Sequence, residues 1–281
     1  MPDREPEGDS PDFAELVARD DLEVTLAEAA LTLARDQYTS IRVTHYLEIL
    51  RSYGDRVERC ARSRSSPAKI ISCINSVLFD DIGFHANTIQ YYDPRNSFLN
   101  QVIDRHTGIP ITLSIVYMEV ARLVGLSIQG VGTPGHFLVR HVDESGPTFI
   151  DPYNQGRRMS AEGVQEMIAE LSGGKLAPRP EHFESVTAKQ ILTRMMINLV
   201  KIYVEGADYS RALWAIDRIL VINPASADFV RDRGMVLAAA GKQNEALDAL
   251  QKYLAMLPDA PDTDLVLDRI REIKQRRATL N

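Results

Sequence analysis

The chain has little of what several specialised protein classes require. Among its 281 residues there are only two cysteines, Cys60 and Cys73, too few for a disulfide framework and without the C-x-x-C spacing of a metal site. No apolar run reaches the length of a membrane span, and the N-terminus lacks the basic and apolar segments of a signal peptide. We therefore expect a protein of the reducing cytoplasm that has no membrane contact, with Cys73 as a small buried thiol.

Concentrated positive charge is also scarce. The formal net charge is −7, and hydrophobic (44%) and charged (25%) residues are close to globular averages. Nucleic-acid binding needs a clustered basic surface. The dense basic clusters here have the pattern of solvated helix faces, and they lie at Arg56, Arg59, Arg62, Arg64, Arg276 and Arg277. We therefore expect no nucleic-acid partner, no metal and no cofactor.

Helical patterns dominate the first part of the chain. Residues 1–11 are charged and proline-rich with almost nothing to bury, so we expect them to be disordered. Apolar spacing predicts one or two amphipathic helices between Phe13 and Ala34 and another from Val43 to Tyr53. Ser66-Pro67 offers an N-cap and a first-turn proline for a further helix that continues to Phe79.

A short β region lies beyond the middle of the chain. Branched and aromatic residues predict antiparallel strands over 126–132, 136–142 and 148–150, with residues 143–147 as a hairpin loop. Residues 178–182 have the composition of a linker, after which the chain is helical. The expected fold class is α+β, a helix-rich region with a small antiparallel sheet followed by an all-α tail.

Three features between Asn96 and Gly156 carry chemistry. Pro110 suits the first position of a helix that runs to about Leu123, because proline lacks the N–H that would have no partner there. His136 is expected at the head of a strand, and Asp151 at the end of another. Papain-like and transglutaminase-like thiol hydrolases distribute their nucleophile, base and orienting acid in this order.

Four motifs in this region make the chain resemble the transglutaminase-like superfamily, and more closely its bacterial SirB-type branch. They are Y-Y-D-P-R-N-S at 91–97, G-I-P-I-T-L-S at 108–114, P-G-H-F at 134–137 and D-P-Y-N-Q-G at 151–156. The resemblance covers roughly residues 20–160. It implies a papain-like core with a central helix on a small antiparallel sheet, and a tetratricopeptide tail.

The chain departs from the active pattern of this superfamily at one position. Aligning Gly108 and Gly125 with the family's glycines places the nucleophilic cysteine on Pro110, which has no nucleophilic atom. His136 and Asp151 match the base and the orienting acid. Ser114 lies one helical turn beyond Pro110 and is the candidate replacement nucleophile, although a small serine also allows close packing of the helix.

A polar loop precedes the central helix and is expected to take part in the cleft. The resemblance places this loop beside the helix, so we expect it to wall the cleft around His136. A simpler alternative is that Asp93 pairs with Arg95 while the tyrosines pack. The candidate cleft residues are Tyr92, Asp93, Asn96, Asn100, Pro134 and Gly135.

The tail contains an internal repeat of the tetratricopeptide length. Asn223-Pro224 and Leu257-Pro258 are separated by 34 positions (258 − 224), and small residues at Ala212 and Ala246 keep the same spacing. We expect repeat units over 193–226 and 227–260 and a final helix over 265–273. The predicted organisation is a disordered segment over 1–11, a transglutaminase-like domain over 12–185 and a repeat tail over 186–281.

Two functions follow from these observations. The first is a non-catalytic transglutaminase-like protein, possessing a cleft that binds a peptide or a side-chain amide and helical repeats that dock a protein partner; Pro110 favours it. The second is an amide hydrolase or acyltransferase in which His136, oriented by Asp151, activates Ser114 or water; the retained pair favours it. The sequence favours the first.

Overall fold

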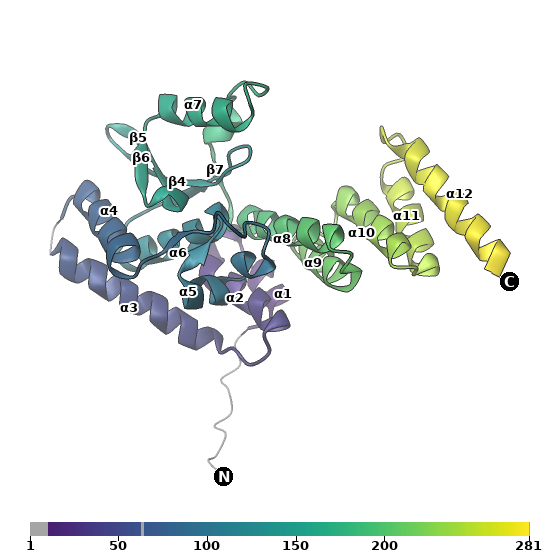
Figure 1. Ribbon diagram of the computed structural model, residues 1–281, viewed down its shortest axis with the longest axis horizontal. Helices are drawn as coiled ribbons and strands as arrows, with labels where there is room; N and C mark the ends of the chain where they lie inside the picture. Colours follow the sequence, from purple (N-terminus) through teal and green to yellow (C-terminus); the bar gives the residue numbers. More distant parts are fainter. Residues whose placement is uncertain (1–10, 63–64, 281) are drawn as a thin grey trace, which may run out of the picture. The chain divides into compact units, whose positions relative to one another are not determined.

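The protein is described by a computed structural model, which covers residues 11–62 and 65–280 (Figure 1). It divides into two compact units, residues 1–192 and 193–281, and the division falls within helix α8, Ala188–Glu205. The boundary predicted from sequence, after residue 185, precedes this helix. Residues 1–10 of the expected disordered segment lie outside the described residues. No helix among the described residues is both long and apolar enough to cross a membrane.

A helical layer opens the first unit. It contains α1 (Phe13–Ala18), α2 (Leu26–Gln37), α3 (Val43–Ala61), α4 (Pro67–Asn75) and α5 (Leu99–Arg105). Helix α3 is longer than predicted, while α4 ends at Asn75 and continues as a π-helical segment, Ser76–Asp81, where a single helix was expected. Ser66 caps α4 as predicted, by accepting a hydrogen bond from the Lys69 amide.

Helix α6, Pro110–Leu123, is the central element of this unit and has the predicted bounds. It packs against α2, α3, α4 and α5, and also against the sheet. Eleven of its fourteen residues are buried, which is the pattern of a helix covered on all sides rather than an amphipathic one. Its one buried carboxylate, Glu119, is paired with the guanidinium of Arg122.

The main sheet has five antiparallel strands in the order β6-β5-β4-β3-β7. Their bounds are Gln129–Val131 (β3), Leu138–Asp143 (β4), Gly146–Asp151 (β5), Arg157–Met159 (β6) and Ser185–Val186 (β7). The strands β6 and β7 were missed because they are too short to show a period. The β4–β5 turn is also tighter than the predicted loop, since Asp143 pairs with Gly146.

Helix α7, Ala161–Leu171, covers one face of this sheet, and α6 packs against the sheet as well (Figure 1). The core under α7 joins strand side chains to helix side chains, namely Val131, Leu138, Phe149, Val164 and Ile168. A separate parallel pair, β1 (His85–Ala86) and β2 (Thr107–Gly108), leads directly into α6. The α+β class predicted from the sequence is confirmed.

The second unit consists of helices at the predicted repeat spacing. Helix α8 is followed by α9 (Tyr209–Ile222), α10 (Ala227–Ala239), α11 (Gln243–Met256) and α12 (Thr263–Leu280). The C-caps Asn223 and Leu257 have nearly the same backbone angles, φ −134° and ψ 83° against φ −136° and ψ 80°. A Cβ on Gly234 would lie 2.7 Å from Leu250 Cδ2, so α10 and α11 approach closely because residue 234 is a glycine.

Cys60 and Cys73 form a disulfide between α3 and α4, with their Cα atoms 5.7 Å apart. The prediction of Cys73 as a free buried thiol is therefore wrong. It failed because the two cysteines are 13 positions apart in the sequence, and their pairing depends on how the two helices pack. Cys73 is 1% exposed, and the disulfide fixes the helix that carries it.

Removing the disulfide should destabilise the first unit. Cys60→Ser is expected to lower the free energy of unfolding by about 3 kcal/mol, because a closed loop of this size restricts the unfolded chain. Urea unfolding followed by circular dichroism measures this. Dithiothreitol should lower the stability of the wild type by a similar amount and leave Cys60→Ser unchanged. Equal stability of the oxidised and reduced wild type would contradict the prediction.

Candidate functional site

His136 and Asp151 form a buried hydrogen-bonded pair in the first unit. His136 Nε2 lies 2.9 Å from Asp151 Oδ2, and the two residues are 8% and 1% exposed. The pairing agrees with the arrangement predicted from their spacing. His136 was predicted at the head of a strand, and it lies two residues before strand β4, which begins at Leu138. The backbone N–H of His136 donates to Thr133 O, which makes Thr133–His136 a turn that presents the ring.

Asp151 ends strand β5 and caps the 3₁₀ turn Pro152–Asn154. Its Oδ1 accepts from the backbone amides of Tyr153 and Asn154, and its Oδ2 accepts from Asn154 Nδ2 at 2.7 Å as well as from His136. Burial by itself raises the pKa of this carboxyl, but the hydrogen bonds from His136 and Asn154 outweigh burial and hold the pKa below its ordinary value. Asp151 is therefore ionised at neutral pH.

The ionised carboxylate determines the tautomer of His136. Because a carboxylate only accepts hydrogen bonds, Nε2 of His136 must carry the proton that it donates to Asp151. In the neutral ring Nδ1 is then the basic atom. The arrangement can orient an imidazole, which is one task of the acid in a nucleophile–base–acid triad.

The helix start that would carry a nucleophile lies in the same region. The turn Pro152–Asn154 packs against both α6 and β1, and β1 pairs with β2, which runs directly into Pro110. Pro110 is buried at the first helical position. Ile109 is the N-cap, and Thr112 Oγ1 lies 3.2 Å from its backbone N–H. The sequence position expected for a cysteine is thus occupied by a residue that only begins the helix.

Ser114 does not take the place of the missing cysteine in this structure. It is fully buried, and its Oγ has no hydrogen-bond partner among the described residues. A serine nucleophile needs a hydrogen bond to its base. The small side chain instead sits in the packed interior around α6.

An aromatic series extends outward from His136. The ring of Tyr153 meets the His136 ring edge-on at 5.8 Å between centroids, Tyr91 meets Tyr153 at 6.5 Å, and Tyr92 meets Tyr91 at 5.3 Å. Exposure rises along the series to 37% for Tyr91 and 59% for Tyr92. The expected placement of the Tyr91–Ser97 loop near His136 therefore has support from these contacts. Tyr153 was missed as a site residue because only folding brings it onto the ring.

Of the remaining residues predicted for the cleft, Asp93 is paired, Asn96 and Asn100 are buried, and Gly135 is exposed. Asp93 binds Arg95 through Oδ1 and Oδ2, as the simpler alternative expected. Asn96 is buried, and its Nδ2 donates to the carbonyls of Gln90 and Tyr91, so it braces the loop from inside. Phe98 is the N-cap of α5. Asn100 is buried on α5, while Pro134 and Gly135 form the turn before His136.

Asn75 is a residue of this region that sequence analysis did not identify. Its Nδ2 donates to Gly156 O at 2.9 Å, and its Oδ1 accepts from the hydroxyl of Tyr117 on α6 at 2.9 Å. Gly156 N in turn donates to Asp151 O at 2.8 Å. Asn75 therefore joins α4, α6 and the turn after Asp151. No sequence pattern marks it, because its partners lie 42 and 81 residues away.

Among the described residues, no group of three His, Cys, Asp or Glu side chains lies close enough together to hold a metal ion. The chemistry available at the site is that of an oriented imidazole beside an aromatic surface.

Family models match both parts of the chain. The model described as transglutaminase-like superfamily matches residues 44–197, and one described as tetratricopeptide repeat matches residues 199–271. A "UPF0162 protein" of Xylella fastidiosa (strain Temecula1) is 34% identical over 93% of this chain and 94% of its own. A "UPF0162 protein" of Vibrio cholerae is 24% identical over 90% and 93%. "F-box only protein 21" of Mus musculus is 31% identical over 56% of this chain and 26% of its own length.

The lowered pKa of Asp151 predicts a pH dependence of stability. A carboxyl whose pKa is lower in the folded protein stabilises the fold fully above its unfolded value, about 4, and this contribution is lost as the pH falls through the folded value. Asp151→Asn should therefore lose less stability than the wild type as the pH falls from about 5 through the folded pKa of Asp151. At pH 7 the variant should be less stable by about 3 kcal/mol, because His136 and Asn154 lose their acceptor.

Urea unfolding at a series of pH values measures both effects. Asp80→Asn, which changes an exposed carboxylate, is the matched control and should retain the wild-type pH dependence. A pH profile of Asp151→Asn parallel to that of the wild type would show that the carboxylate is not ionised in the fold.

Proposed function

Because the chain belongs to the transglutaminase-like superfamily and carries tetratricopeptide repeats, we propose that it binds a peptide or protein partner without catalysing a reaction on it. The observation that carries this proposal is Pro110, which stands at the helix start where active members would have their cysteine. The thiolate attacks amides that a serine attacks only with a well-placed base. Ser114 Oγ, with no hydrogen-bond partner among the described residues, has no such base.

The surface around His136 offers a peptide both polar and apolar contacts. Tyr153, Tyr91 and Tyr92 present aromatic rings of increasing exposure, and aromatic side chains supply much of the energy at protein interfaces. His136, held by Asp151, places an oriented imidazole beside these rings. A non-reacting ligand needs these contacts and no nucleophile.

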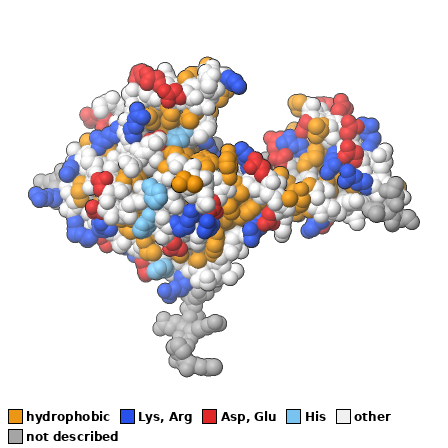
Figure 2. All heavy atoms as spheres, viewed as in Figure 1, with side chains coloured by type: hydrophobic (Ala, Val, Ile, Leu, Met, Phe, Trp, Pro, Cys, Tyr) orange, Lys and Arg blue, Asp and Glu red, His pale blue; other side chains and the backbone are white. Residues whose placement is uncertain are grey.

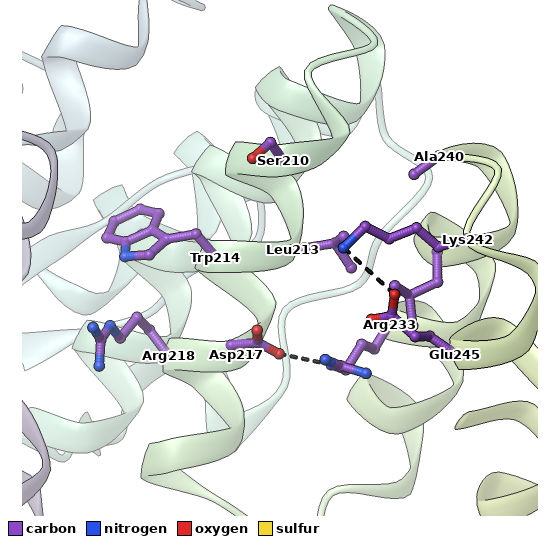
Figure 3. Close-up of a pocket in the computed structure, with 10 residues that line it drawn as sticks. Ser210, Leu213, Trp214, Asp217, Arg218, Arg233, Ala240, Lys242 and Glu245 are labelled. Atoms are coloured by element: carbon purple, nitrogen blue, oxygen red, sulfur yellow. Dashed lines mark hydrogen bonds and ion pairs between the residues drawn. The ribbon is translucent and has the colours of Figure 1, made fainter. Parts of the chain in front are cut away.

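The repeat unit supplies a second docking surface in this proposal. A cavity of about 520 Å³ is lined by residues of α9, α10 and α11 and by Lys242 (Figure 3). Asp217 binds Arg233 and Lys242 binds Glu245 along it, while Trp214 and Arg218 extend from α9 on another side. The proposal also places the protein in the cytoplasm. Disulfides such as Cys60–Cys73 are more common in oxidising compartments.

A serine-directed probe separates this function from its alternative, a hydrolase that uses Ser114 or water. We expect a fluorophosphonate to leave the protein unmodified and simple amides to remain intact, because Ser114 is buried and makes no hydrogen bond to a base. Intact-mass spectrometry measures the labelling. Modification of Ser114 in the wild type that disappears in His136→Ala would establish the hydrolase instead.

Binding is tested with a peptide array probed by the full chain. Tyr153→Ala should weaken the selected peptides about tenfold or more, as expected for an aromatic residue at the centre of an interface. Leu22→Ala is the control, because Leu22 is a fully exposed apolar side chain outside the aromatic series. Equal losses in both variants, or none in Tyr153→Ala, would contradict binding at this surface.

A further inference from the structure

The side chain of Asn75 connects the central helix to the segment that holds Asp151. It accepts from the Tyr117 hydroxyl and donates to Gly156 O, each at 2.9 Å. Gly156 N donates to Asp151 O, which closes the turn over Pro152–Asn154. Within that turn the backbone amides of Tyr153 and Asn154 bind the Asp151 carboxylate. The contacts therefore run from α6 through Asn75 to the group that orients His136.

Gly156 is shaped to receive Asn75. It has φ +72°, a conformation that favours glycine, and a Cβ at this position would overlap the Asn75 side-chain amide. Gly125 has almost the same φ, +73°, but nothing lies within 4 Å of its Cβ position. The two glycines therefore share a backbone angle, but only Gly156 is approached closely by another side chain, that of Asn75.

The helix that carries Asn75 changes its winding at this residue. Helix α4 ends at Asn75, and Ser76–Asp81 continues as a π-helix. Segments of π-helix are rare and are found frequently at functional sites, since they shift a side chain relative to a regular helix. Cys73, two residues earlier, is joined to Cys60 on α3, so the same part of α4 is anchored covalently.

We propose that Asn75 is the positioning residue of the His136–Asp151 pair. Its two hydrogen bonds fix the Asp151–Gly156 turn against α6, and that turn holds the carboxylate in the orientation that His136 requires. Tyr117 is fully buried, so its hydroxyl has a strong requirement for this partner. The inference concerns the site of the proposed function, but it requires no ligand to be bound there.

The hydrogen bond between His136 Nε2–H and Asp151 provides a direct readout. In the full chain labelled with ¹⁵N-histidine, this N–H should give a downfield, slowly exchanging proton resonance, assigned by its loss in His136→Gln. Asn75→Ala should accelerate its exchange with water by roughly tenfold or more, the equivalent of one lost hydrogen bond. Tyr117→Phe should give a smaller acceleration, because Asn75 keeps its bond to Gly156.

Two controls separate positioning from a general loss of stability. Ile71→Val removes one buried methyl group from the same helix without touching Gly156, and it should leave the resonance unchanged. Gly156→Ala should displace Asn75 and accelerate exchange, whereas Gly125→Ala, with the same backbone strain and open space, should not. Should Asn75→Ala fail to fold, Asn75→Ser and the glycine pair give the same comparison.

Wild-type exchange of the His136 resonance in Asn75→Ala would overturn the proposal, as would equal acceleration in Asn75→Ala and Ile71→Val. Neither result bears on whether Ser114 reacts with a fluorophosphonate. Conversely, labelling of Ser114 would overturn the non-catalytic function and leave the role of Asn75 intact.

Discussion

The Asp151 carboxylate is the constraint around which the first unit is arranged. A buried charge is costly unless hydrogen bonds replace the lost water, and here four donors meet its two oxygens. Three of the donors come from the turn after strand β5. The fourth is the His136 ring, which the turn before β4 presents to the carboxylate. Asn75 and Tyr117 connect the turn after β5 to the central helix. The surrounding turns thus bury the Asp151 carboxylate and supply the hydrogen bonds that it needs.

The chemical role of the His136–Asp151 pair depends on whether a nucleophile stands at the start of α6. With a thiol at the start of α6, it would be a base and its orienting acid. With Pro110 there, the same geometry is a rigid polar group beside the rings of Tyr153, Tyr91 and Tyr92. The space-filling view shows hydrophobic side chains gathered on the visible face of the first unit, among scattered charges of both signs (Figure 2).

Local signals in the sequence predicted much of this structure, and long-range contacts account for what was missed. Pro110 and Gly125 delimit α6 because proline and glycine act on the backbone where they stand. The spacing of His136 and Asp151 suited two paired strands, and the structure joins their side chains. By contrast, the Cys60–Cys73 disulfide, the strand Ser185–Val186 and the role of Asn75 depend on which helices and strands meet. The burial of Ser114 has the same origin, since the polarity of a residue does not reveal the number of neighbours around it.

The matching backbone at Asn223 and Leu257 has a consequence for how the tail can change in evolution. Two joints with the same angles, 34 residues apart, are interchangeable connectors. Duplication of one 34-residue segment would therefore add a helical pair in register, and the new pair would contact only its neighbours. The length of the tail is therefore open to change in whole units of 34 residues.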